Sequence, residues 1–158
     1  MYKRQREHPE PVNLPHELLA DVIRRTIARG GSVLIPTFAV DRVEVVLKAL
    51  AEMRRDDRIP EVPIYVNSPM ALNALEVYRD MTEELRADLR LEESIDRPHL
   101  HEVRTADESK ALTSDGPHEP SIILSSSGML TGGRVLHHLE RMLPYPENAV
   151  VLLSLIHI

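Results

Sequence analysis

One stretch constrains the fold of this chain more than any other, residues 121–139, which read S-I-I-L-S-S-S-G-M-L-T-G-G-R-V-L-H-H-L. It begins with an apolar run, residues 122–124, of the kind that forms a strand buried on both faces. Serines and Gly128 end this strand, and an apolar pattern at helical spacing resumes after Gly133. The stretch therefore predicts a strand, a Ser/Gly loop and a helix, which is the repeating unit of α/β proteins.

A loop of this composition at the start of a helix is suited to bind an anion. Glycines let the backbone approach closely, serine hydroxyls donate hydrogen bonds, and unpaired N–H groups of the first helical turn point at the ligand. Arg134, just inside the helix, adds a positive charge suited to phosphate. The spacing alone leaves two interpretations open, a loop that binds phosphate and a connection that simply needs flexible residues.

Strands and helices alternate along the rest of the chain. Apolar runs predict strands at residues 33–38, 62–67, 99–103, 122–124 and 149–153, and amphipathic segments predict helices between them. With 158 residues the chain has the length of one domain. The predicted fold class is α/β, with a mainly parallel sheet flanked by helices on both faces.

Composition excludes several kinds of function. The net charge is -6, so the surface as a whole does not favour nucleic acid, and any basic patch must be local. The chain has no cysteine, which excludes disulfides and thiolate metal sites. No apolar run reaches the length of a membrane span and no secretory signal is recognisable, so we expect a cytoplasmic protein with no membrane partner.

Three of the predicted strands end in polar, turn-prone sequence. The endings read P-T-F-A-V-D-R, N-S-P-M and S-S-S-G-M. Ligands of parallel sheets collect at the carboxyl ends of the strands. We therefore expect the polar side chains of these endings to converge on one edge: Arg42, Ser68, Ser125, Ser126 and Ser127.

Taken together and in order, these strand ends resemble the β-CASP domain of metallo-β-lactamase-fold nucleases. That group includes ribonuclease J and the endonuclease subunit of the cleavage and polyadenylation factor. The helix that reads G-G-R-V-L-H-H-L is most similar to the bacterial and archaeal branch. The resemblance predicts a β-CASP domain at residues 6–152. Residues 1–5 and 153–158 resemble translated sequencing-adapter sequence, and we expect them to be a non-native lead and tail.

The resemblance implies that the full-length parent is a zinc-dependent RNA phosphodiesterase. In the family, the metallo-β-lactamase half holds two zinc ions through an H-x-H-x-D-H motif and further ligands, and the β-CASP half grips the RNA backbone. The expected partners are RNA and the missing metallo-β-lactamase domain in cis, with a possible homodimer. The expected RNA or phosphate contacts are Arg42, Ser68, Ser125, Ser126, Ser127, Gly128, Gly133 and Arg134, with His8 and His137 as possible cleft residues.

The sequence also departs from the family. The H-x-H-x-D-H motif is missing, and where His99 and His101 imitate its first half, Val103 and Arg104 stand in place of Asp and His. We expect no catalytic residue, metal ligand or cofactor in this fragment, which is then inactive alone. The alternative function is a non-catalytic RNA-processing scaffold module of the same fold.

One acidic pair near Arg42 also leaves two interpretations. Asp41 and Glu44 either form a catalytic cluster with Arg42, or they are charged residues at i,i+3 spacing on a solvated helix face. The second interpretation is favoured, since charged residues on an amphipathic helix usually face solvent.

Overall fold

The computed structural model describes residues 16–80, 99–114, 116 and 119–153. Within these ranges helices and strands alternate, as the apolar pattern predicts. The elements are α1 (Glu17–Ala28), β1 (Val33–Pro36), α2 (Arg42–Arg55), β2 (Ile64–Asn67), α3 (Pro69–Asp80), β3 (Leu100–Glu102), α4 (Ala106–Ser114), β4 (Ile122–Ser125), α5 (Arg134–Met142) and β5 (Ala149–Val150). No helix among the described residues is long and apolar enough to cross a membrane.

The strands form one parallel sheet with the order β3-β2-β4-β1-β5. The central strand β4 pairs with both neighbours in matching register, so that Ser125 lies opposite Pro36 on one side and Asn67 on the other. Because all three strands run in the same direction, their carboxyl ends meet at one edge. This confirms the predicted convergence of the three strand ends.

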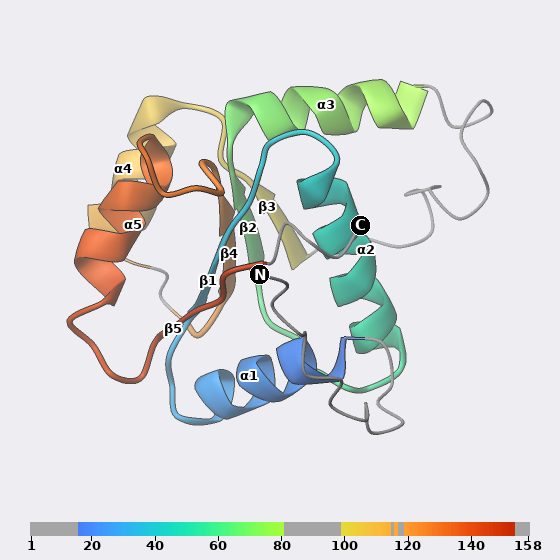
Figure 1. Ribbon diagram of the computed structural model, residues 1–158, viewed down its shortest axis with the longest axis vertical. Coiled ribbons are helices and arrows are strands. Elements are labelled where there is room, and N and C mark those ends of the chain that lie inside the picture. Colours follow the sequence, from blue (N-terminus) through green and yellow to red (C-terminus); the bar gives the residue numbers. More distant parts are fainter. Residues whose placement is uncertain (1–15, 81–98, 115, 117–118, 154–158) are drawn as a thin grey trace, which may run out of the picture.

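Helices cover both faces of the sheet (Figure 1). Helices α1, α2 and α3 lie on one side, and their apolar residues pack on Val33 and Ile35 of β1. Helix α5 lies on the other side with α4 beside it, and it packs on Leu34 and Ile123. The strands read as continuous apolar runs because both faces are buried. The α/β fold class is confirmed.

Side chains at the helix starts account for two boundaries. The hydroxyl of Ser68 accepts a hydrogen bond from the Ala71 N–H at 3.3 Å, so it caps α3 with Pro69 at the first helical position. At α4, Glu108 N–H donates to Thr105 Oγ1 at 3.1 Å and Thr105 N–H donates to Glu108 Oε2 at 2.9 Å. This reciprocal pair starts α4 at Ala106.

Four expected strands are shorter in the structure than in the prediction, and two of them, β2 and β3, differ by two residues each. β1 ends at Pro36, because the chain turns there into the connection that leads to α2. β5 covers only Ala149–Val150, although Val151 N–H still donates to Leu34 O at 2.9 Å. Residues 83–96, an acidic segment for which the sequence predicts helix between the second and third strands, lie outside the described residues, as does His8.

Candidate functional site

The serines at the strand ends divide into inward-facing and outward-facing groups. Ser125 is fully buried and its hydroxyl donates to the Asn67 carbonyl at 3.3 Å. Ser68 is 1% exposed, and its hydroxyl accepts from Ser126 Oγ at 2.8 Å. Ser126 and Ser127 are only half-buried. The inner serines therefore join β2 to β4, and the outer two remain accessible at the edge.

Residues 126–133, here called the serine loop, connect β4 to α5. Its carbonyls accept two N–H groups of the first helical turn: Val135 N–H donates to Ser126 O at 3.2 Å and Leu136 N–H to Gly133 O at 3.3 Å. These two groups are therefore not free for a ligand, contrary to the expectation that the helix start donates to an anion. The Ser126 hydroxyl already donates to Ser68, so the Ser127 hydroxyl, which accepts from Met129 N–H at 3.3 Å, is the one of the two that keeps its hydrogen for a ligand.

Two glycines give the serine loop its shape. Gly133 has φ +81°, and a Cβ there would lie 3.2 Å from Ser126 O. A Cβ on Gly128 would lie 3.0 Å from the backbone nitrogen of Phe38, in the connection after β1. The loop thus packs closely against the end of β1, and only glycine fits at both positions without displacement.

Arg42 supplies a positive charge at the same edge. It is the first residue of α2 and is half-buried, and its side chain has no hydrogen-bond or ion-pair partner among the residues that the structure describes. The neighbouring Asp41 accepts from Tyr78 Oη at 2.6 Å, and this hydrogen bond raises the pKa of Tyr78 to about 12. Asp41 is thus engaged with Tyr78, and the Arg42 guanidinium is available to an anion.

Arg134, by contrast, is bonded inside the protein. Its Nη1 donates to Asn67 Oδ1 at 2.9 Å and to Val103 O at 3.0 Å, and its Nη2 donates to Arg104 O at 3.1 Å. The guanidinium that was expected to meet phosphate therefore links the start of α5 to the ends of β2 and β3 in this structure.

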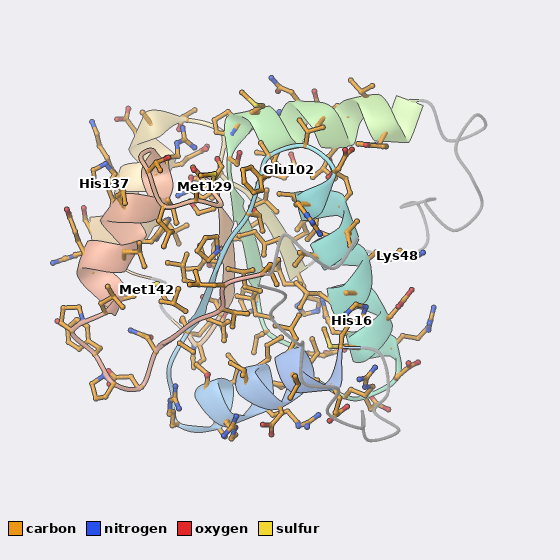
Figure 2. The ribbon with its side chains drawn as sticks, viewed as in Figure 1. His16, Lys48, Glu102, Met129, His137 and Met142 are labelled. Atoms are coloured by element: carbon orange, nitrogen blue, oxygen red, sulfur yellow. The ribbon has the colours of Figure 1, made fainter. Side chains whose placement is uncertain are left out.

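The adjacent histidines of α5 have opposite environments. His138 is 2% exposed, with Nε2 2.7 Å from Asn67 Nδ2. Burial, followed by repulsion from His137, lowers the pKa of His138 to about 4. His137 is exposed and lies on the outer side of α5 (Figure 2). It faces away from the strand ends, so the structure does not bring the two histidines together at the candidate site.

Glu44 corrects the interpretation of the acidic pair. Glu44 is only 7% exposed, and neither of its carboxylate oxygens has a hydrogen-bond partner among the described residues. The interpretation as a solvated helix face is therefore wrong for Glu44, whereas Asp41 is exposed as expected. Burial, followed by the charge of Asp41, raises the pKa of the Glu44 carboxyl. Thr37 Oγ1, at the end of β1, is also buried without a partner in the described part of the chain.

The described residues do not fit a zinc site. Across residues 16–80, 99–114 and 119–153, no three His, Cys, Asp or Glu side chains lie close enough to hold a metal ion. His101 is exposed and its ring stacks on Tyr65, with centroids 4.8 Å apart. The possible metal ligands among the described residues are thus isolated histidines and carboxylates, and no step of metal chemistry is assigned to them.

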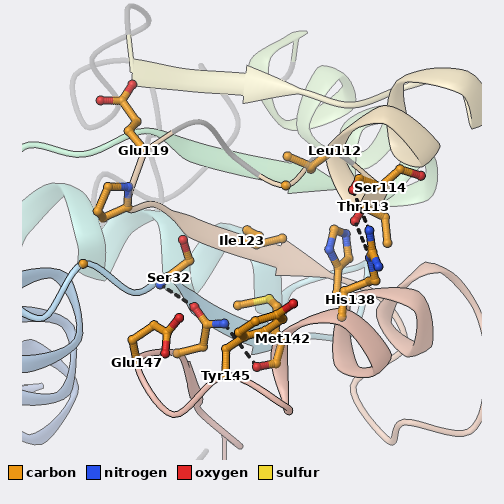
Figure 3. Close-up of a pocket in the computed structure, with 15 residues that line it drawn as sticks. Ser32, Leu112, Thr113, Ser114, Glu119, Ile123, His138, Met142, Tyr145 and Glu147 are labelled. Carbon is orange, nitrogen blue, oxygen red and sulfur yellow. Dashed lines mark hydrogen bonds between the residues drawn. The ribbon is translucent and has the colours of Figure 1, made fainter.

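A separate groove of about 460 Å³ lies between the end of α4, α5 and the segments that lead into β1 and β4. Figure 3 shows Leu112 and Met142 beside Ile123 of the sheet, with Glu119 and Glu147 toward its rim. Ser32 in its wall precedes β1, so the groove opens at the amino ends of the strands, away from the serine loop.

Sequence reasoning missed the importance of Asn67. Its side chain, at the end of β2, is fully buried and is hydrogen-bonded to Ser109 of α4 and to Arg134 and His138 of α5. The available signal was a polar residue at the end of an otherwise apolar strand, in N-S-P-M. Such a residue is normally buried only when its hydrogen bonds are made.

Comparison with known proteins agrees with this arrangement. The family model of the Beta-Casp domain matches residues 43–155. Ribonuclease TTHA0252 of Thermus thermophilus is 40% identical over 136 residues, which cover 83% of this chain and 31% of the relative. Transcription termination factor FttA of Methanothermobacter thermautotrophicus is 36% identical over 146 residues, or 88% of this chain and 22% of the relative.

A third relative, the RNase J-like protein of Methanocaldococcus jannaschii, is 34% identical over 135 residues, covering 85% of this chain and 30% of its own length. The chain thus spans between 22% and 31% of these three relatives. The family match covers most of the described fold, including the serine loop and α5. The chain belongs to the Beta-Casp domain family.

Proposed function

We propose that this chain is the substrate-gripping Beta-Casp domain of a zinc-dependent, metallo-β-lactamase-fold ribonuclease, and that its strand-end edge binds RNA phosphates. The observation that carries the proposal is that the accessible hydroxyl of Ser127 lies at the same sheet edge as the Arg42 side chain, which has no partner among the described residues. The names of two relatives, a ribonuclease and an RNase J-like protein, support RNA as the substrate.

The chemistry of the edge suits phosphate binding. The hydroxyl of Ser127 donates to a phosphate oxygen, and the guanidinium of Arg42 forms charge-assisted hydrogen bonds to phosphate at the same edge. Contacts of this kind fix the position of an RNA strand without reading its sequence. The proposal therefore assigns binding to these residues and assigns no bond cleavage to them.

Hydrolysis is proposed only for the whole protein. Its zinc ions would be held by a metallo-β-lactamase domain in cis, since the described residues offer no set of three ligands. A cytoplasmic location and a homodimer are further predictions for that protein. Cell fractionation tests the location, and size-exclusion chromatography with light scattering tests the dimer.

The second candidate is a non-catalytic RNA-processing module of the same fold. It is favoured by relatives whose name, transcription termination factor, states no nuclease activity. Reading the gene beyond both ends of this sequence separates the two candidates. An intact H-x-H-x-D-H motif in the adjoining domain supports the ribonuclease, and a domain without these ligands supports the scaffold.

The binding proposal is tested on this chain by a matched pair of arginine variants. Arg42→Gln removes the cation at the strand ends, whereas Arg54→Gln removes the same charge roughly 18 Å along the same helix. We expect Arg42→Gln to weaken binding of a short single-stranded RNA about tenfold and to reduce the slope of log affinity against log salt by about one. Equal weakening by both variants would indicate unspecific attraction and would contradict the proposal.

A further inference from the structure

The side-chain amide of Asn67 is buried and makes hydrogen bonds through both of its polar atoms. Oδ1 accepts from Arg134 Nη1 at 2.9 Å, and Nδ2 lies 3.0 Å from Ser109 Oγ and 2.7 Å from His138 Nε2. These partners come from α4 and α5, while Asn67 itself ends β2. A single side chain therefore connects three elements below the strand-end edge.

The partners determine which way the amide points. A guanidinium only donates, so the atom next to Arg134 must be the amide oxygen. The amide nitrogen then carries two hydrogens, which match its two partners, Ser109 Oγ and His138 Nε2. His138 Nε2 is thus an acceptor, and the imidazole is neutral with its proton on Nδ1.

Asn67 also reaches both ends of the serine loop. At the first end, its carbonyl accepts from Ser125 Oγ at 3.3 Å, and the next residue, Ser68, accepts from Ser126. At the other end, its amide oxygen holds Arg134, which directly follows Gly133. A displacement of Asn67 would therefore shift both ends of the loop relative to β2.

We infer that Asn67 is a positioning residue of the phosphate site, which holds both ends of the serine loop in place through Ser125 and Arg134. The inference rests on the proposed function, because the loop is the proposed phosphate-binding element. It assigns Arg134 and Ser126 to the support of the loop and leaves the contact with phosphate to Ser127 and Arg42.

The orientation of the amide is tested by Asn67→Asp. A carboxylate oxygen in place of Nδ2 cannot donate, so His138 must present an N–H to it. Long-range ¹⁵N–¹H NMR reports this directly. We expect the Nδ1–H tautomer in the wild-type chain, and an Nε2–H or doubly protonated ring at pH 6 in the variant. A wild-type ring protonated on Nε2, or an unchanged ring in Asn67→Asp, would overturn the inference.

The positioning itself is tested by binding of a short single-stranded RNA. Asn67→Ala and His138→Phe remove the hydrogen bond between the two side chains. We expect about a tenfold loss of RNA affinity, equivalent to the loss of one charge-assisted hydrogen bond between the serine loop and a phosphate. His138→Gln restores an acceptor and is expected to recover most of that loss. Asn73→Ala, at an exposed position of α3, is the matched control and should leave the affinity unchanged.

Two further readouts separate the possible failures. If Asn67→Ala does not fold, the comparison of His138→Gln with His138→Phe carries the test, and equal affinities of these two variants would contradict the positioning role. If the wild-type chain binds no RNA, the proposed function fails. In that case the backbone amide shifts of the serine loop still decide the positioning: they should move in His138→Phe and not in Asn73→Ala, and unmoved loop amides in His138→Phe would overturn it.

Discussion

Asn67 Nδ2 lies 2.7 Å from His138 Nε2, across 71 positions of the sequence. The contact joins the end of β2 to α5, and it requires a neutral imidazole because the amide nitrogen donates. The same buried side chain of Asn67 is bonded to Arg134 at the start of α5. The candidate site therefore depends on a buried polar network as well as on the residues exposed at the edge.

The buried histidine predicts a loss of stability in mild acid. The pKa of His138 is about 4 in the folded chain against an ordinary value of 6.5, so the unfolded chain binds more protons between these values. The free energy of unfolding should therefore fall as the pH drops from 6.5 toward 4, by roughly 3 kcal/mol in total. Urea unfolding at several pH values measures this. His138→Gln should remove most of the dependence, and an unchanged slope in the variant would contradict the prediction.

Glu44 predicts the opposite dependence on pH. Its carboxyl is buried without a partner among the described residues, and its pKa is raised, so the folded chain holds this proton above pH 4.5 more firmly than the unfolded chain. Its contribution to stability is therefore lost as the pH rises through the folded pKa. Glu44→Met should stabilise the fold at pH 7 by about 1–2 kcal/mol, and the gain should shrink toward pH 4.5.

A matched variant controls the Glu44 experiment. Glu52 lies on the same helix, half-exposed, 4.0 Å from Lys48 Nζ. Glu52→Met should change the free energy of unfolding by less than about 0.5 kcal/mol. If both substitutions stabilise the chain equally, the effect comes from helix propensity or net charge, and burial of the carboxyl is not its cause.

The close packing of the serine loop predicts a difference between two of its glycines. A Cβ at Gly128 would lie 3.0 Å from the backbone nitrogen of Phe38, whereas a Cβ at Gly132 would meet no atom of the described residues within 4 Å. Gly128→Ala should therefore cost about 1–3 kcal/mol of stability, and Gly132→Ala should cost little. Thermal unfolding of both variants provides the test. Similar melting temperatures would mean that the loop does not pack against β1 as described.

The sequence predicts the fold well because apolar runs and turn residues are local signals. The runs at Ile122 and Val33 identify buried parallel strands, and Ser68 with Pro69 identifies the start of α3. The convergence of three strand ends follows from parallel pairing, without knowledge of any contact.

The side-chain partners within the site could not be predicted in the same way. Arg134 is bonded to carbonyls 30 and 31 residues away, in the segment after β3. Glu44 is buried because α2 turns that side of its first turn inward. The helical pattern alone shows neither direction, since both depend on the packing of distant elements.

The most direct test of the account is to map RNA binding on the isotope-labelled chain by NMR. A short single-stranded RNA at low salt should shift the backbone amides of Ser126, Ser127 and Gly128 and the start of α2, and Ser127→Ala should weaken the effect. Inorganic phosphate should shift the same loop more weakly. Shifts confined to the groove between α4 and α5, or no shifts at millimolar RNA, would contradict the claim that the strand-end edge binds the RNA backbone.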